Sequence, residues 1–246
     1  MTAVSTPLWV RRFHAREKTT RFVVCFSHAG GSASYFFPFS ELLPDDVEVL
    51  AVQYPGRHDR YREAPFEHIE DFVDPIAAAL EPYLEHQVAF FGHSLGALVG
   101  FEVTRRLEER GHTLTTFFAS GRRAPSTWRD ERPETLTDEE FITEIQKLNG
   151  TSAAAFADED LVRMVLPTLR SDYTAAANYP VNTDRTIKSP VVALIGDDDP
   201  KCTIAEAEAW SGHARGGFAI TVFPGGHFYL DNHRQELATV LAGAFS

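Results

Sequence analysis

The feature that most constrains this sequence is a serine between two glycines, the segment Gly-His-Ser-Leu-Gly at residues 92–96. An apolar run typical of a β-strand, residues 87–91, leads into it, and apolar residues at helical spacing follow over residues 97–107. This context predicts a sharp strand-to-helix turn that holds the hydroxyl of Ser94 clear of the sheet. Both glycines are expected to be required, because a Cβ at either position would clash with the crossing backbone. The helix would point its first N–H groups at Ser94, where negative charge develops during acyl transfer.

Composition places the chain among ordinary soluble globular proteins rather than nucleic-acid or membrane proteins. With 246 residues and 43% hydrophobic residues, we expect one domain covering residues 1–246. The formal charge of −12 argues against binding to nucleic acid or to anionic membranes. No apolar run approaches the roughly 20 residues of a membrane span, and residues 1–7 do not resemble a secretion signal. Two cysteines, Cys25 and Cys202, cannot form a disulfide framework. We therefore expect a cytoplasmic protein with reduced thiols.

Strand patterns alternate with helix patterns along most of the chain, which predicts an α/β fold with a largely parallel sheet. Ligands of such sheets bind beyond the carboxyl ends of the strands, so the loops that follow the strands should face one crevice. The strands are expected at residues 21–26, 47–52, 87–91, 114–119, 190–196 and 218–223, with a possible edge strand within 7–13. Helices are expected at residues 69–84, 97–107 and 204–210, with a last one closing near 244.

The regular alternation breaks between residues 125 and 189, where no strand pattern occurs. A capping box at residues 137–140 precedes apolar positions up to 148, and a second helical pattern runs from about residue 158 toward 179. Pro167 lies inside the second pattern and is expected to kink or split that helix. Helices inserted above the strand ends predict a lid over the crevice. The alternative is an extra packing layer with no part in substrate access.

A base and an acid for Ser94 follow the last two predicted strands. His227 is the candidate base, because among the late histidines it alone sits in a loop directly after a strand. A run of three carboxylates, Asp197 to Asp199, follows the preceding strand, and periodicity does not say which of them orients the histidine. The chain order serine, aspartate, histidine is that of α/β-hydrolases. In such a triad the histidine takes the serine proton while the carboxylate fixes the histidine tautomer.

Six short segments together resemble one family of α/β-hydrolases, the stand-alone type II thioesterases of polyketide and non-ribosomal peptide biosynthesis. The segments are residues 28–33, 53–57, 92–97, 120–125, 196–200 and 224–228, and the resemblance extends over nearly the whole chain. It implies an α/β-hydrolase fold with a mostly parallel central sheet, flanking helices and an inserted helical lid. The family's acid stands three residues after the glycine of its loop, which selects Asp199 beside Ser94 and His227. The implied oxyanion hole is formed by the backbone N–H groups of Ala29 and Leu95.

The resemblance also implies an activity and a partner. Enzymes of this family hydrolyse aberrant or stalled acyl groups from the phosphopantetheine arm of acyl carrier or peptidyl carrier proteins, and they need no metal or other cofactor. An activated serine with two oxyanion donors suits that reaction. Two other functions stay open. One is a general esterase, lipase or peptidase of the same fold that acts on free small molecules, and the other is an inactive module that only binds carrier proteins.

Arginines after two of the strands are candidates for docking a carrier protein. An acidic carrier would be repelled by a chain of charge −12 at long range, so productive encounter would need a local positive patch. Arg57, Arg122 and Arg123 lie on the expected active-site side and predict such a patch. The alternative is that these arginines pair with internal acids such as Glu63 or Asp59, or hold the loops together.

Overall fold

The computed structural model describes residues 8–16, 18–148 and 159–246. Within these residues seven strands form one sheet, in the order β1-β3-β2-β4-β5-β6-β7. All neighbouring strands are parallel except β1, which pairs antiparallel with β3 at the edge. This confirms the predicted parallel sheet. The strands are β1 (Val10–Arg11), β2 (Arg21–Phe26), β3 (Glu48–Val52), β4 (Gln87–His93), β5 (Thr116–Ser120), β6 (Val191–Gly196) and β7 (Phe218–Phe223).

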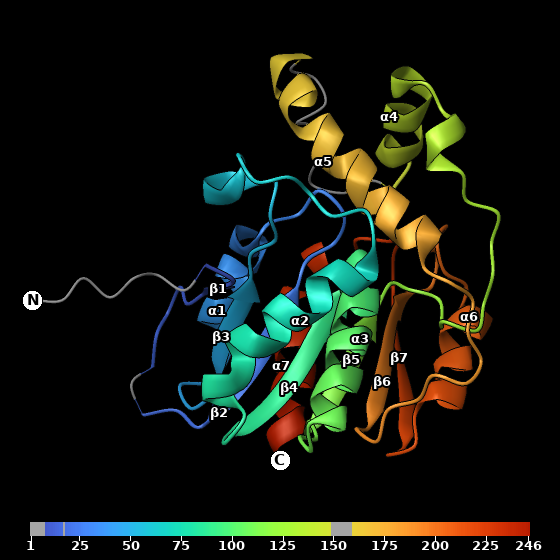
Figure 1. Cartoon of the computed structure of the whole chain (residues 1–246). Helices are drawn as coiled ribbons and strands as arrows, with labels where there is room; N and C mark the ends of the chain where they lie inside the picture. The colour runs from blue at the N-terminus through green and yellow to red at the C-terminus, as the bar shows by residue number, and fades with distance from the viewer. Residues whose placement is uncertain (1–7, 17, 149–158) are drawn as a thin grey trace, which may run out of the picture.

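Helices cover both faces of the sheet (Figure 1). On one face α2 and α3 bury apolar side chains against the strands, and on the other face α1 and α7 do the same. Two further helices, α4 and α5, lie above the carboxyl ends of the strands, at the top of the view. The helices are α1 (Phe37–Leu42), α2 (Ile69–Leu80), α3 (Leu95–Glu109), α4 (Asp138–Gln146), α5 (Glu159–Asn178), α6 (Ile204–Glu208) and α7 (Arg234–Ala242).

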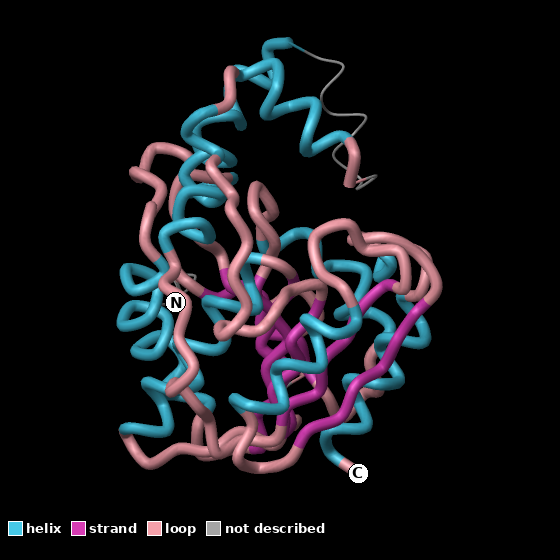
Figure 2. The backbone as a smooth tube through the Cα atoms, turned by 90° about the vertical axis from the view of Figure 1, so that its right-hand side faces the viewer, coloured by secondary structure: helices cyan, strands magenta, loops and turns pink. Residues whose placement is uncertain are grey.

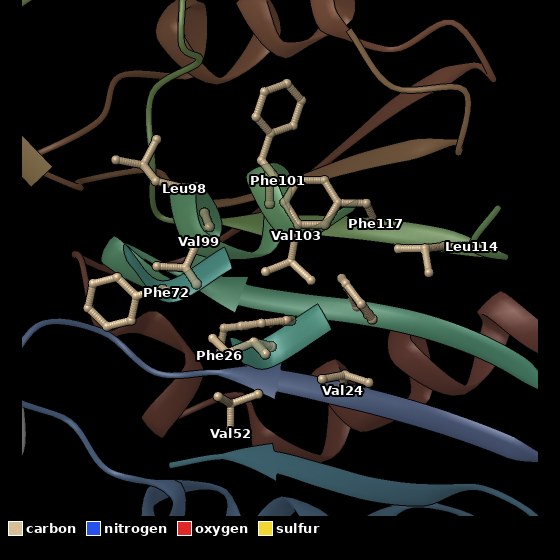
Figure 3. Packing of buried hydrophobic residues seen from close by; sticks show 14 of the residues in the cluster. Val24, Phe26, Val52, Phe72, Leu98, Val99, Phe101, Val103, Leu114 and Phe117 are labelled. Atoms are coloured by element: carbon tan, nitrogen blue, oxygen red, sulfur yellow. The ribbon is translucent and has the colours of Figure 1, made fainter. Parts of the chain in front are cut away.

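The larger core lies between the sheet and the helices α2 and α3. Figure 3 shows Phe117 of β5 beside Phe101 of α3, and Phe26 of β2 below Val99 of the same helix, with Phe72 of α2 at the left. Helix α3 is buried on all sides over its first ten residues, because α2, the sheet and α5 surround it. A helix buried in this way reads as apolar around its whole circumference. The helix that follows Ser94 is therefore held rigidly beneath the site.

The structure differs from the sequence-based expectation in two elements. Helix α1 (Phe37–Leu42) follows a 3₁₀ turn (Ala33–Phe36), in a region where no helix is expected from the sequence. Six residues are too few to establish a helical period, and burial of Phe36 and Phe39 against the sheet holds this helix in place. Pro167 does not split α5, which continues through it to Asn178. Leu166 and Leu169, on either side of the proline, pack with Phe141 and Ile145 of α4, and this packing stabilises the helix on both sides of Pro167.

The order of the strands in the sheet indicates where a ligand would bind. From β2 the chain first adds β3 on one side and then β4 on the other side of β2. In parallel sheets ligands bind at such a change of side, in the crevice at the carboxyl ends of the strands. The loops after β2 and β4 are neighbours, since Phe26 pairs with Gly92. Figure 2, turned by 90°, shows the helices of the 125–189 insertion projecting beyond the ends of the strands. None of the described helices is both long and apolar enough to cross a bilayer.

Candidate active site

Ser94 occupies the strained turn that the sequence predicts. It lies between β4 and α3 with φ 55° and ψ −114°, and its N–H donates to the carbonyl of Ser120 at 2.8 Å. A positive φ is uncommon for a residue with a side chain, and such strain clusters at functional sites. A Cβ on Gly92 would lie 2.2 Å from the carbonyl oxygen of Gly96, and one on Gly96 would lie 2.1 Å from that of Phe26. The steric requirement for both glycines is therefore confirmed.

A buried histidine–aspartate pair faces the same cavity as Ser94. Nδ1 of His227 lies 3.0 Å from Oδ1 and 2.9 Å from Oδ2 of Asp199, and the two residues are 2% and 7% exposed. Oδ1 of Asp199 also accepts the Lys201 N–H at 2.8 Å. Asp197 and Asp198 are exposed, and Asp197 accepts the N–H of Gly225 in the next loop. Of the three carboxylates, Asp199 alone is paired with His227.

Close backbone approach at two further glycines lets His227 reach toward Ser94 from β7. A Cβ on Gly196 would lie 2.3 Å from the carbonyl oxygen of Gly225, so the loops after β6 and β7 can touch only because residue 196 is glycine. Gly121, at the end of β5, has φ +57°, and a Cβ there would lie 2.6 Å from Cε1 of His93 and 3.4 Å from Cε1 of His227. A glycine at the end of β5 therefore leaves room for both imidazoles.

The two residues expected to form the oxyanion hole, Ala29 and Leu95, both line the cavity in front of Ser94. His28 to Gly31 form a turn in which the Gly31 N–H donates to the His28 carbonyl at 2.9 Å, and Gly30 has the φ of +74° that type II turns need. Ala29 in this turn lines the cavity. Leu95 lines the same cavity as the first residue of α3, and the first N–H groups of a helix have no acceptor within the helix.

The cavity in front of Ser94 has a volume of about 380 Å³. Its floor is made by the residues just described, its roof mainly by apolar and aromatic residues of α4 and α5, and its rim mainly by charged residues. The residues that contribute are Ala29, Ser94, Leu95, Gly121, Arg122 and His227 below, Phe141, Ile145, Tyr173 and Ala176 with the single carboxylate Glu144 above, and Asp130, Glu131, Arg132, Pro133, Thr135, Leu136 and Lys201 at the rim. Such a chamber accommodates an apolar group of the size of a short acyl chain.

Two other imidazoles flank His227 without carrying charge at neutral pH. The His93 ring lies 5.0 Å from that of His227, and the His28 ring lies 6.0 Å from that of His93. Burial, with a smaller contribution from His227, lowers the pKa of His28 to about 3 and the pKa of His93 well below its usual value. Both rings therefore stay neutral, so neither adds a formal positive charge next to the imidazolium that would form on His227.

The arginines predicted to form a docking patch are not on the surface. Arg57 is 7% exposed and makes two bonds with Asp172, at 2.7 and 2.8 Å. Arg123 is 6% exposed and pairs with Glu131 at 2.7 Å. The docking prediction is therefore wrong for both, because their guanidinium groups are used inside the protein, although their partners are not Glu63 or Asp59. Arg122 is partly buried and lines the cavity that Ser94 also lines.

A mostly parallel sheet with a serine on the turn between a strand and a buried helix defines the α/β-hydrolase class. Within that class the chain belongs to the thioesterase family, whose domain model matches residues 21–243. The protein is therefore a thioesterase, an enzyme that hydrolyses thioesters.

Relatives and solved structures point to the same branch of this family. The chain is 47% identical to the thioesterase PikA5 of Streptomyces venezuelae over 236 residues, which is 95% of this chain and 84% of that protein. The type II thioesterase BorB from the borrelidin biosynthetic cluster superposes with a TM-score of 0.90 at 41% identity, covering 97% of this chain and 98% of BorB. RedJ, a thioesterase from the prodiginine pathway in Streptomyces coelicolor, gives 0.86 at 34% identity over 94% and 87% of the two chains. These similarities confirm the resemblance to type II thioesterases.

Proposed function

We propose that this thioesterase removes aberrant or stalled acyl groups from the phosphopantetheine arm of acyl carrier or peptidyl carrier proteins. The observation that carries the proposal is the meeting of Ser94 with the buried His227–Asp199 pair at a cavity whose roof is apolar. The similarity to BorB, a type II thioesterase of the borrelidin biosynthetic cluster, and to RedJ, a thioesterase of the prodiginine pathway, supports the same reading. Carrier-bound intermediates are thioesters with acyl chains, and an apolar roof above a nucleophile suits them.

The residues have distinct roles in the proposed reaction. The Ser94 hydroxyl attacks the thioester carbonyl while Nε2 of His227 takes its proton, and Asp199 holds the imidazole in the tautomer that can accept it. The N–H groups of Ala29 and Leu95 stabilise the oxyanion. His227 then returns the proton to the departing sulfur, which leaves as the free thiol of the arm. Water repeats the sequence on the acyl-enzyme and releases a carboxylic acid.

A comparison of matched substrates tests this function against that of a general esterase. We expect kcat/KM for an acyl-carrier protein to exceed that for the same acyl group as a thioester of N-acetylcysteamine, and both to exceed that for the corresponding oxygen ester. The measurement is free thiol or free acid released under equal conditions. Faster hydrolysis of the oxygen ester would favour a general esterase instead. Binding of the acyl-carrier protein without acid release would favour a module that only binds carriers.

The proposal assigns the 125–189 insertion as a lid within a single domain that spans the chain, although residues 149–158 of it lie outside the described part. Phe141 and Ile145 of α4 pack with Leu166 and Leu169 of α5 into a small apolar cluster separate from the two main cores. The cluster contacts Ala29, so it rests directly on the loop that follows β2. A roof that binds substrate should have its own apolar cluster with one face on the cavity. A layer that served only for packing should instead share the apolar contacts of the main cores.

Substitutions in this cluster test whether it selects the acyl chain or contributes only to packing. Ile145 lines the cavity, and Leu166 belongs to the same cluster without being among the cavity's described lining residues. We expect Ile145→Ala to shift preference toward longer or branched acyl chains, by up to the 1–3 kcal/mol per methylene, or about 10- to 200-fold, typical of apolar pockets. The measurement is kcat/KM over a series of acyl chain lengths. Leu166→Ala is the control, expected to lower the melting temperature without changing the ranking. An unchanged ranking in both variants would mean that the roof does not select the acyl group.

A further inference from the structure

Helix α5 is fastened to the core by its second half. Thr168 donates its hydroxyl to the Gly56 carbonyl at 2.7 Å, and Asn178 donates to the Glu67 carbonyl at 3.3 Å. Between these two contacts, Asp172 is fully buried, with a residue exposure of 0%. Leu169 and Ala175, three residues to either side of Asp172, are also buried, so this carboxylate occupies a position in the apolar stripe of the helix.

Asp172 binds the loop after β2 and the loop after β3 at once. Its Oδ2 accepts the backbone N–H of Gly30 and a guanidinium N–H of Arg57, both at 2.7 Å, and its Oδ1 accepts a second Arg57 N–H at 2.8 Å. The Arg57 group also donates to the Gly31 carbonyl at 3.1 Å. A charged acceptor with a forked donor gives strong and directional hydrogen bonds. The Asp172–Arg57 pair therefore holds the turn from His28 to Gly31 by two backbone groups, the Gly30 N–H and the Gly31 carbonyl.

The turn that Asp172 holds is the one that carries Ala29. Fixing the Gly30 N–H sets the plane of the peptide that joins Ala29 to Gly30, next to the N–H group proposed for the oxyanion hole. Apolar packing reinforces this contact, since a Cβ on Gly30 would lie 2.7 Å from Cδ1 of Leu169. Helix α5 therefore fits closely against the turn through one polar and one apolar contact.

We propose that Asp172 is a positioning residue that couples the seating of α5 to the oxyanion hole. With α5 in place, its carboxylate and Arg57 hold the turn so that the Ala29 N–H points into the cavity; with α5 displaced, the turn loses this anchor. The roof of the acyl chamber and one oxyanion donor are then assembled together, which restricts hydrolysis to the closed enzyme. This inference rests on the proposed function, because it takes the Ala29 N–H as an oxyanion donor.

The competing explanation is that the Arg57–Asp172 pair contributes only to folding. Replacing a buried ion pair by apolar residues of similar volume is often neutral or stabilising, whereas removing one partner leaves an unpaired buried charge. The double variant Arg57→Met with Asp172→Leu therefore removes the anchor of the Gly30 N–H without leaving such a charge. We expect it to fold, and its kcat for an N-acetylcysteamine thioester to fall about 10- to 100-fold, less than the 10²–10³-fold typical of deleting an oxyanion donor outright.

Separate measurement of kcat and KM distinguishes a positioning role from a purely structural one. Contacts made in the transition state lower kcat when they are lost and leave KM nearly unchanged. We expect the affinity for a trifluoromethyl ketone analogue of the acyl thioester, which forms a tetrahedral adduct on the serine, to fall in parallel with kcat. The matched control is Tyr179→Phe, which removes another polar contact of the α5 segment, from the Tyr179 hydroxyl to Glu102, away from the turn. This control should keep the wild-type kcat.

Each outcome decides the question. A folded double variant with wild-type kcat and inhibitor affinity would overturn the positioning role while leaving the proposed function intact. If this double variant does not fold, Arg57→Gln with Asp172→Leu decides by the same criterion, because it also removes the acceptor of the Gly30 N–H and leaves no buried charge. If the wild-type enzyme does not hydrolyse the thioester, the proposed function fails, and this inference fails with it.

Discussion

Ser94→Ala is expected to lower kcat for thioester hydrolysis by about 10⁶-fold while leaving the protein folded, and His227→Ala should cause a loss of similar size. Losses of this scale occur where serine and histidine act as one unit. The reason is geometric: the Ser94 hydroxyl stands on a turn with φ 55°, at the cavity that His227 also lines. The double variant should be no slower than either single variant, since each substitution already disables the unit.

The measurement is kcat for an N-acetylcysteamine thioester, together with fluorophosphonate labelling located by mass spectrometry. Label should attach to Ser94 in the wild-type protein. Ser34→Ala supplies a matched control, because Ser34 is exposed and bonds to the hydroxyl of Ser32 at 2.7 Å, away from the residues that line the cavity. Robust turnover by Ser94→Ala, or labelling at another serine, would contradict the proposed mechanism.

The turn around Ser94 could be predicted from the sequence because its cause is local. The strand, the two glycines and the helix follow one another directly in the sequence. In the structure the backbone passes so close to Gly92 and Gly96 that neither position has room for a Cβ. The six parallel strands could be predicted for a similar reason, as each is a short apolar run bounded by turn residues. The antiparallel edge strand β1 has two residues and pairs only with β3, so the sequence gives no more than a hint of it.

The role of the arginines could not be predicted because their partners are distant in sequence. Arg57 pairs with a carboxylate 115 residues further along the chain, and nothing near it in the sequence marks that contact. Asp172 does leave a signal: a charged residue at a position of the helix where Leu169 and Ala175 indicate burial. Charged residues are almost never fully buried unless they are paired, so such a position calls for a buried cation. Applied to residues 158–179, this rule would have indicated a hidden partner.

Three adjacent aspartates illustrate the other limit of sequence reasoning. The three side chains, of Asp197, Asp198 and Asp199, are chemically identical. They differ only in whether the turn after β6 points them toward solvent or toward the interior. In the structure Asp197 caps the neighbouring loop and Asp198 is exposed, whereas Asp199 turns inward to His227. Resemblance to a family selects Asp199 where periodicity does not, and the distances agree with that selection.

Asp199→Asn should lower kcat by about 10⁴-fold with little effect on folding, as for the equivalent change in other triads. The structure explains how the tautomer would change. Oδ1 of Asp199 accepts the Lys201 N–H at 2.8 Å, and the variant's amide oxygen would keep this bond, which turns its NH₂ group toward Nδ1 of His227. Nδ1 must then accept a hydrogen bond, so the ring proton moves to Nε2. A histidine protonated at Nε2 cannot take the proton of Ser94.

The control is Asp198→Asn, which changes an exposed carboxylate of the same loop and should leave kcat within about twofold, as is usual for surface substitutions away from the site. Both variants are compared by kcat, by melting temperature and by the affinity for a non-hydrolysable acyl thioether, which does not need the base. We expect Asp199→Asn to bind the thioether as the wild type does, because the carboxylate does not line the cavity among the described residues. An equal loss of kcat in the two variants would mean that Asp199 has no role distinct from that of its loop. Full activity in Asp199→Asn would mean that Asp199 is not the acid of the triad.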